Sequence, residues 1–429
     1  MKTIPTRLNF SLFTTTLTVL ALLSLPGGSA LAANWTITDL GALGAPGNVA
    51  YESRAYSISN AGQVAGKGVV LTNGALANHY VVWSNGTQID LGIHINSSGV
   101  DAAPINDAGQ VAGVIEAEGG RPFLWETGVV TRLPLLPDTV DGCRVKGITA
   151  SGAVVGDNGV QRWWGVERVS VRWQGGTVTD LGVPRGEAVA INDFGALAIN
   201  NPTPGWRSYV MNGGSSNLVD VPGLNPSFGT TAAIDLNNAG QVCGWFLVDP
   251  TVSGSPHAFL WQGGVGTPLP EFPSHSSSTA VALNNLGHAV GNAYRSASDN
   301  PAVLWRDGTM TSLNDLPEVQ AAGWWSLVAR DINDHGQIVG FGYHGGLVRA
   351  FLLSPVTAPS PFSLTITRSG TNVLVSFPTE ASFSYNVQSK ASLTESNWNL
   401  LATIPGNGTT QSATDPATNA ARFYRVVVP

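Results

Sequence analysis

Five tryptophans stand out as residues that could hold a ligand. An indole ring offers a flat apolar face, and such faces stack on the apolar faces of sugars. The five lie in segments whose length varies along the chain: Trp163, Trp164, Trp206, Trp324 and Trp325. We therefore expect them to form a ligand-binding surface, with carbohydrate as the candidate ligand.

Catalytic machinery is not evident. The sequence contains no His-Glu-x-x-His, Gly-x-Ser-x-Gly, Walker or Cys-x-x-Cys motif. A Gly-x-Gly-x-x-Gly match at Gly340 lies in a strand pattern, without the strand-to-helix context of a dinucleotide site. Asp235 and Asp331 lie near the same predicted strand of their repeats and could be the two carboxylates of a glycosidase or polysaccharide lyase. We predict no catalytic residue, no metal site and no cofactor, with such an enzyme as the alternative.

A nine-residue pattern that occurs seven times predicts the fold. Each copy begins with Ile or Leu, continues through polar residues to Gly at position five, and closes on a small or aliphatic run. Because Gly readily takes the positive φ of a tight turn, each copy indicates a β-hairpin. The copies start 43 to 49 residues apart, a period typical of four-stranded propeller blades. They are Ile58–Gly66, Ile105–Gly113, Ile148–Gly156, Ile191–Ile199, Leu236–Gly244, Leu283–Gly291 and Ile332–Gly340.

A second hairpin follows the first. An apolar strand ends in Trp, with an aliphatic residue eight positions later, as at Trp83/Leu91 and Trp173/Leu181. We interpret these tryptophans as packing between sheets. Repeat seven lacks a fourth strand, and the mature chain begins with an additional one at Trp35–Gly41. We predict an all-β chain: a seven-bladed β-propeller whose last blade is completed by the N-terminal strand.

The turns within the hairpins have constant lengths, whereas the connections between hairpins and between repeats vary. Strand directions alternate in a four-stranded meander, so both kinds of variable loop emerge on one rim. Variable loops on a rigid scaffold are typical of a binding face, although such loops also tolerate neutral change. We expect the five tryptophans above on this rim.

Export is predicted from the N-terminus. Lys2 and Arg7 precede an apolar stretch that ends in a small-residue cleavage pattern near Ala32. The mature chain has a net charge of 19 − 28 = −9, which argues against nucleic-acid binding. The expected domains are a signal peptide at 1–32, the propeller at 33–353, a Pro-rich linker at 354–361, and a fibronectin type III-like or immunoglobulin-like β-sandwich at 362–429.

The repeat resembles the HAF-repeat family of extracellular bacterial proteins. The likeness is clearest at Ile105–Gly113 and at His257-Ala258-Phe259-Leu260-Trp261, and it covers about residues 35–355. The resemblance implies an exported protein, and it provides no catalytic residues. We predict a secreted or periplasmic, non-catalytic binding or scaffold protein, monomeric and without a transmembrane anchor after cleavage. Its expected partners are glycans or surface proteins, and a protein–protein interaction scaffold is a further alternative.

Overall fold

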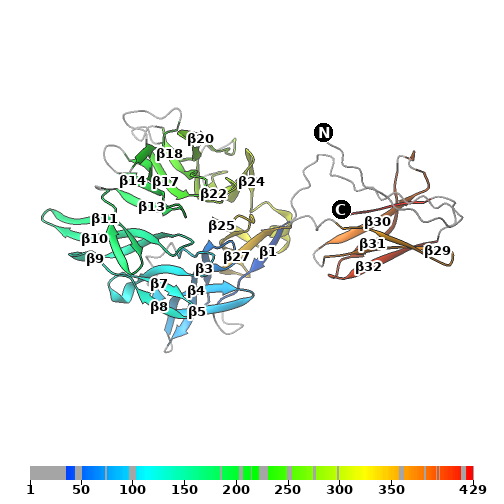
Figure 1. The fold of residues 1–429 in the computed structure, drawn as a ribbon, viewed down its shortest axis with the longest axis horizontal. Helices are drawn as coiled ribbons and strands as arrows, with labels where there is room; N and C mark the ends of the chain where they lie inside the picture. Colours follow the sequence, from blue (N-terminus) through cyan, green and yellow to red (C-terminus); the bar gives the residue numbers. More distant parts are fainter. Residues whose placement is uncertain are drawn as a thin grey trace. The chain divides into compact units, whose positions relative to one another are not determined.

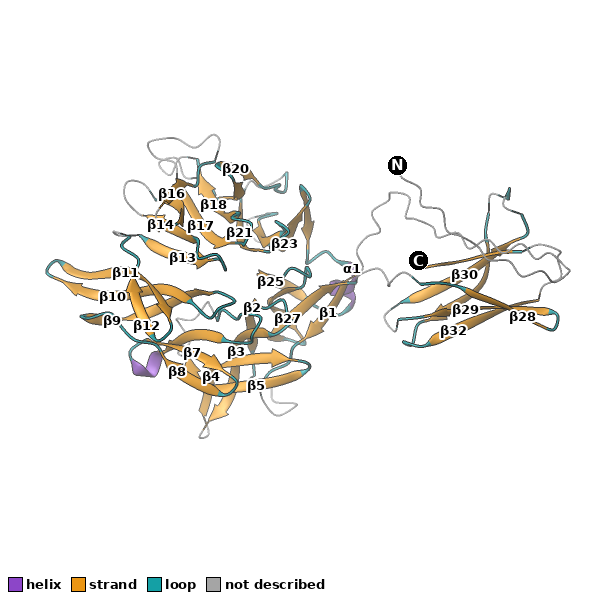
Figure 2. Cartoon of the chain, viewed as in Figure 1, coloured by secondary structure: helices purple, strands orange, loops and turns teal. Residues whose placement is uncertain are grey.

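The computed structural model describes residues 35–43, 51–72, 75–95, 103–183, 186–201, 206–213, 215–221, 230–248, 254–273, 277–296, 299–356, 362–380, 383–392, 394–395, 397–416 and 422–428. The predicted signal peptide at 1–32 lies outside these residues. The chain separates into a repeat unit, Trp35–Pro355, and a C-terminal unit that begins at Val356. Strands dominate both units, with two short helices in the described part, so the all-β prediction is confirmed (Figures 1 and 2).

The described residues of the repeat unit form seven antiparallel sheets, one for each copy of the nine-residue pattern. The first sheet consists of β2 (Ser53–Ile58), β3 (Val64–Thr72), β4 (Ala75–Ser84) and β5 (Thr87–Ile95), and the second of β6 (Val111–Ile115), β7 (Arg121–Glu126) and β8 (Val129–Arg132). The third consists of β9 (Thr139–Ile148), β10 (Val154–Arg162), β11 (Gly165–Gln174) and β12 (Thr177–Asp180). The fourth consists of β13 (Glu187–Ile191), β14 (Leu197–Asn201), β15 (Arg207–Asn212) and β16 (Ser215–Leu218).

The remaining three sheets follow the same order. They are β17 (Thr230–Leu236), β18 (Val242–Leu247), β19 (His257–Gln262) and β20 (Val265–Pro268); β21 (Ser278–Leu283), β22 (Ala289–Ala293), β23 (Ala302–Arg306) and β24 (Thr309–Ser312); and β25 (Trp325–Ile332), β26 (Ile338–His344) and β27 (Leu347–Pro355) with β1 (Trp35–Asp39). The helices are η1 (Glu116–Glu118) and α1 (Pro317–Ala321).

The first strand of the repeat unit belongs to its last sheet. β1 pairs with β27 in antiparallel register, from Trp35 opposite Pro355 to Asp39 opposite Phe351 (Figure 1). The expected exchange of the N-terminal strand is therefore present. Ser354 and Pro355, which were expected in the linker, are the end of β27, because β1 extends this strand by pairing with both.

Side chains at position two of the nine-residue pattern join neighbouring sheets. Five copies carry Asn there, and each Asn donates from Nδ2 to the main-chain oxygen at position two of the next copy, at 2.8 to 3.1 Å. The donor from the last copy is Asn333, and its acceptor is Ser59 of the first. The two copies without such a bond carry Ser59 and Thr149 at this position.

Position three adds a second series of bonds between sheets. In six copies the main-chain N–H at position three donates to the side chain at position three of the next copy, at 2.6 to 2.9 Å. This series also joins the last copy to the first, through Asp334 N–H and Asn60 Oδ1 at 2.8 Å. The seventh bond is missing where the acceptor position holds Ala150, which has no polar atom.

The glycine that ends most copies fits a bulge in the neighbouring strand. A Cβ built on Gly244 would lie 2.0 Å from the carbonyl oxygen of Ala232, and Gly66, Gly156, Gly291 and Gly340 are confined in the same way. In the pairs concerned, the register of the inner strand shifts by one residue opposite the glycine. The glycine thus leaves room for a residue that the inner strand does not pair.

The repeated tryptophans are buried, as predicted for packing residues. Trp83, Trp125, Trp173, Trp261 and Trp305 all lie in the hydrophobic clusters of the repeat unit. Trp173 also donates from Nε1 to the oxygen of Pro134, at 2.7 Å, and Trp305 bonds Pro270 in the same way at 2.8 Å. These two hydrogen bonds join each tryptophan's sheet to the chain segment that precedes that sheet.

The C-terminal unit contains two three-stranded sheets that share one core. They are β28 (Thr365–Ser369), β29 (Asn372–Pro378) and β32 (Thr410–Pro416), and β30 (Ser384–Lys390), β31 (Asn399–Pro405) and β33 (Phe423–Val427). The core is centred on Phe377, Tyr385 and Tyr424. Residues 357–361 of the expected linker lie outside the described part of the chain.

Candidate functional site

A cavity of about 840 Å³ lies where the first segments of all seven repeats meet. Its wall comes from β2, the segment Ala103–Ile105, β9, β13, β17, β21 and β25, which are the innermost parts of their sheets. We call it the axial cavity. Its walls are mixed in polarity, and its size would admit a small organic ligand or part of a longer one.

The bulges turn one residue per repeat into the axial cavity. Each is the unpaired residue of its inner strand and lies two places before its nine-residue copy. We call the six the bulge residues: Tyr56, Lys146, Val189, Ile234, Val281 and Arg330. Repeat two places Ala103 at the corresponding position of the wall. β-Bulges often redirect side chains next to binding sites, which is their geometry here.

The residue that follows each bulge residue also lines the cavity in several repeats, and in repeats five and seven it is Asp235 and Asp331. Asp331 accepts hydrogen bonds from the Ser57 hydroxyl at 2.9 Å and from the Ile58 and Ile332 N–H groups at 2.8 Å. Burial, followed by the charge of Asp235, raises the pKa of Asp331 to about 7, while these hydrogen bonds oppose the increase. Both aspartates keep some surface on the cavity, and water there weakens the effect of burial.

Asp235 is used in the same way as Asp331. Its two oxygens accept from the N–H groups of Leu236, at 2.8 Å, and Leu283, at 3.0 Å, so the carboxylate joins β17 to β21. Burial raises its pKa. The structure thus brings the two carboxylates of the enzyme alternative into one cavity, but each is already held by main-chain donors of the neighbouring sheet.

The axial cavity narrows toward the turns of the nine-residue pattern. The first residue of every copy forms an aliphatic ring there: Ile58, Ile105, Ile148, Ile191, Leu236, Leu283 and Ile332. Beyond this ring, a second, smaller cavity of about 200 Å³ is lined by the Asn and Asp side chains of positions two and three. Because most of these side chains form hydrogen bonds between sheets, we interpret the smaller cavity as part of the scaffold and not as a binding site.

Two tryptophans also line the axial cavity. Trp206, one of the five predicted residues, is 50% exposed and contributes to the wall. Its φ is +25°, an unusual value for a residue other than glycine and one that often marks functional positions. Trp245 on β18 also lines the wall, and it is not among the five predicted residues.

The other four predicted tryptophans do not line the axial cavity. Trp163 and Trp164 lie in the turn between β10 and β11, where they are 91% and 56% exposed with their rings 5.1 Å apart. Trp325 is exposed and stacks on Tyr343, with ring centroids 4.2 Å apart. The first pair thus belongs to the third sheet and Trp325 to the seventh.

Trp324 departs from the expectation of an exposed ligand contact. It is 4% exposed, with its ring stacked 4.6 Å from that of His344 and edge-on to Phe351. Adjacent residues at the start of a strand project to opposite sides. Of the pair Trp324-Trp325, one indole is therefore buried and the other faces outward.

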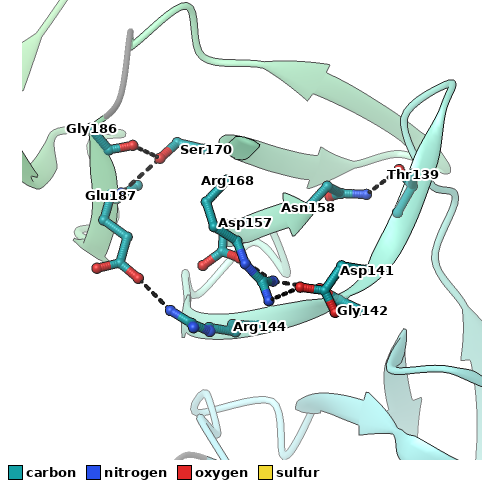
Figure 3. A network of polar contacts seen from close by, with 11 residues as sticks. Thr139, Asp141, Gly142, Arg144, Asp157, Asn158, Arg168, Ser170, Gly186 and Glu187 are labelled. Atoms are coloured by element: carbon teal, nitrogen blue, oxygen red, sulfur yellow. Dashed lines mark hydrogen bonds and ion pairs between the residues drawn. The ribbon is translucent and has the colours of Figure 1, made fainter. Parts of the chain in front are cut away.

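A polar network between the third and fourth sheets pairs the charged residues beside the cavity (Figure 3). Glu187 lines the cavity and pairs with Arg144 of β9 at 2.8 Å. Behind them, Arg168 bonds to the buried Asp157 at 3.0 Å and to Asp141 at 2.6 Å. The acidic group of Glu187 is thus already neutralised by a neighbouring sheet.

Among the described residues, no three His, Cys, Asp or Glu side chains are grouped as metal ligands would be. In the same residues, no helix is long and apolar enough to cross a membrane.

Comparison with known proteins yields only distant structural likenesses. No family model matches the chain, and neither does any curated protein. Among solved structures, YCF48 bound to D1 peptide has a TM-score of 0.40 at 12% identity and covers 80% of this chain and 100% of that one. The β-propeller domain of the Trilobed protease from Pyrococcus furiosus has a TM-score of 0.31 at 10% identity and covers 76% and 89%. TolB from Acinetobacter baumannii has a TM-score of 0.33 at 11% identity and covers 84% and 82%.

Proposed function

We propose that this chain is an exported, non-catalytic binding protein that takes its ligand in the axial cavity, with carbohydrate as the ligand class. The proposal includes membership of the HAF-repeat family, closure of the seven sheets as a seven-bladed propeller, and a C-terminal β-sandwich module. Hydrogen bonds and strand pairing between the last repeat and the first support closure.

The bulge residues are the observation that carries the proposal. A scaffold built only for stability has no need to turn an unpaired residue from six of its seven repeats into a shared cavity. Here the unpaired residues differ in chemistry from repeat to repeat, whereas the nine-residue copies beside them are nearly uniform. In a binding site on a repeat scaffold, we expect residue types to vary at the cavity wall and to stay constant in the scaffold.

The test is a glycan array probed with the mature chain from residue 33, followed by calorimetric titration of the best ligand. We expect Trp206→Ala to weaken binding about tenfold or more, since it removes an aromatic wall, and Trp163→Ala, outside the cavity, to leave it unchanged. Val281→Arg, which places a long side chain in the cavity, should also block binding. Melting curves show that each variant is folded. Binding that survives in both cavity variants and is lost in Trp163→Ala would move the site to the outer rim.

The glycosidase or lyase alternative is favoured by one observation, the shared cavity of Asp235 and Asp331. A carboxylate that donates or accepts a proton must be able to reach its substrate. The known partners of these carboxylates are the hydroxyl and N–H groups that join the sheets. Release of new reducing ends or unsaturated products from a bound polysaccharide, abolished in Asp331→Asn but retained in Trp163→Ala, would establish the enzyme instead.

A further inference from the structure

The bulge residues divide the axial cavity into two chemically different sides. Repeats four, five and six contribute the apolar residues Val189, Ile234 and Val281. Repeats seven, one and three contribute Arg330, Tyr56 and Lys146. Trp206 and Trp245 come from repeats four and five and so extend the apolar side.

The cationic side has an ammonium group available to a ligand. Lys146 makes no hydrogen bond or ion pair with any residue in the described part of the chain, although it is half-buried in the wall. A half-buried ammonium without a protein partner indicates that its partner is water or a ligand. The Arg330 guanidinium lies over the rings of Tyr56 and Phe341, at 5.6 and 5.7 Å, and these two faces hold it in place on the wall.

The acidic groups of the wall are already engaged. Glu187 pairs with Arg144, and the oxygens of Asp235 and Asp331 accept the hydroxyl and N–H donors that join the sheets. The net formal charge of the wall therefore does not determine which charge the cavity presents to a ligand. What the cavity offers a ligand is an apolar wall with cationic donors opposite.

We infer that the ligand is a carboxylated sugar, whose ring packs on the apolar side while its carboxylate meets Lys146, on the side of the cavity that also holds Arg330. Uronic acids combine these features in one residue, an apolar ring face and a carboxylate at the edge. An ammonium and a guanidinium both give charge-assisted hydrogen bonds to a carboxylate. This inference rests on the proposed function and specifies the ligand of the same cavity.

The experiment compares two forms of one ligand. Trimers of galacturonate, glucuronate, mannuronate and guluronate are titrated calorimetrically into the mature chain, each as the free acid and as its methyl ester. The ester keeps the sugar ring and removes the charge. We expect the chain to bind at least one acid more tightly than its ester, and added salt to weaken binding of the acid alone.

Lys146→Met keeps the length of the side chain and removes its charge. We expect it to weaken binding of the acid by about 10- to 100-fold, which corresponds to one charge-assisted hydrogen bond, and to leave the ester unaffected. Arg306→Met, which removes a cation outside the cavity, is the matched control and should change neither. Melting temperatures of both variants should equal that of the parent chain.

The failures of the two proposals look different. Equal affinity for acid and ester, or no binding of any uronate while neutral glycans bind in a Trp206-dependent manner, would overturn the acidic ligand and keep the binding function. No glycan binding of any kind on the array or in titration would overturn both.

Discussion

Asn284 performs two tasks that substitution can separate. Its Nδ2 donates to the oxygen of Asn333 in the next sheet at 3.0 Å, and its Oδ1 accepts from the N–H of His288 in its own turn, also at 3.0 Å. Thr149 is at the same position of repeat three. Its hydroxyl accepts the corresponding N–H of its turn at 3.0 Å and gives no bond to the next sheet. Asn284→Thr should therefore remove the bond between sheets and keep the bond from His288; the second bond to Oδ1, from the N–H of Leu286 at 3.1 Å, has no counterpart at Thr149.

The structure sets the size of the effect. After the substitution, the oxygen of Asn333 still accepts the N–H of Gly336 at 3.0 Å, so no buried group is left without a partner. The main loss is then the net value of the bond between sheets, about 0.5–1.5 kcal/mol. The N–H of Leu286 belongs to an exposed residue and can bond to water instead. Asn284→Ala loses the turn bond as well and should cost about 1 kcal/mol more.

The reciprocal change tests the same reasoning in the opposite direction. Thr149→Asn restores a donor that can reach the oxygen of Asn192, and it should stabilise the chain by up to about 1 kcal/mol. The assay is urea unfolding of the mature chain followed by circular dichroism, with the transition of the repeat unit fitted separately. Equal stability of Asn284→Thr and the parent, together with no gain in Thr149→Asn, would show that the bonds between sheets contribute nothing measurable.

Two further perturbations follow from the inner strands. Gly244→Ala places a Cβ 2.0 Å from the Ala232 oxygen, and it should destabilise the chain by about 3 kcal/mol or more in urea unfolding. The control is Gly263→Ala in an open turn, which should cost about 1 kcal/mol because Gly263 has a positive φ. Similar losses in both variants would refute the steric argument. Because the pKa of Asp331 is raised from 3.8 to about 7, its contribution to stability is complete below about pH 4 and is lost as the pH increases through 7. The stability deficit of Asp331→Asn relative to the parent should therefore shrink between pH 4 and 8, by at most about 4 kcal/mol from three pKa units, and a pH-independent deficit would contradict the raised pKa.

The strand order of the repeat unit could be predicted from the sequence because the information is repeated. A Gly at position five and a Trp before the second turn recur in register, so both hairpins are visible without any tertiary contact. The additional strand at Trp35 and the missing one after β27 could be matched by the same comparison. The bonds between sheets were missed, because Asn at position two was explained by its turn alone, and the acceptor in the next copy is 43 to 49 residues away.

The candidate site was predicted only in part, for a geometric reason. Exposure of a tryptophan depends on which face of a strand it occupies, and this alternation separates Trp324 from Trp325 although both lie in the same variable segment. Trp206 was selected as a member of a rim and proved to line a cavity. Its neighbour Trp245 lies just after a copy of the pattern and looked like an ordinary strand residue.

A comparison of the repeats with one another contained a signal for the bulge residues. Three places before each copy the described residues are Ala or Val, and they are buried, as at Ala55, Val145 and Ala329. One place later the residue types diverge, from Lys146 to Val189. A position under packing constraint stays small and apolar, because added volume in a filled core is costly. Two bulge residues still pack in the core, since Tyr56 belongs to one buried hydrophobic cluster and Val189 lies against another. A bulge that faces a cavity nevertheless tolerates side chains of different size and charge, and the proposed binding function would depend on this variety.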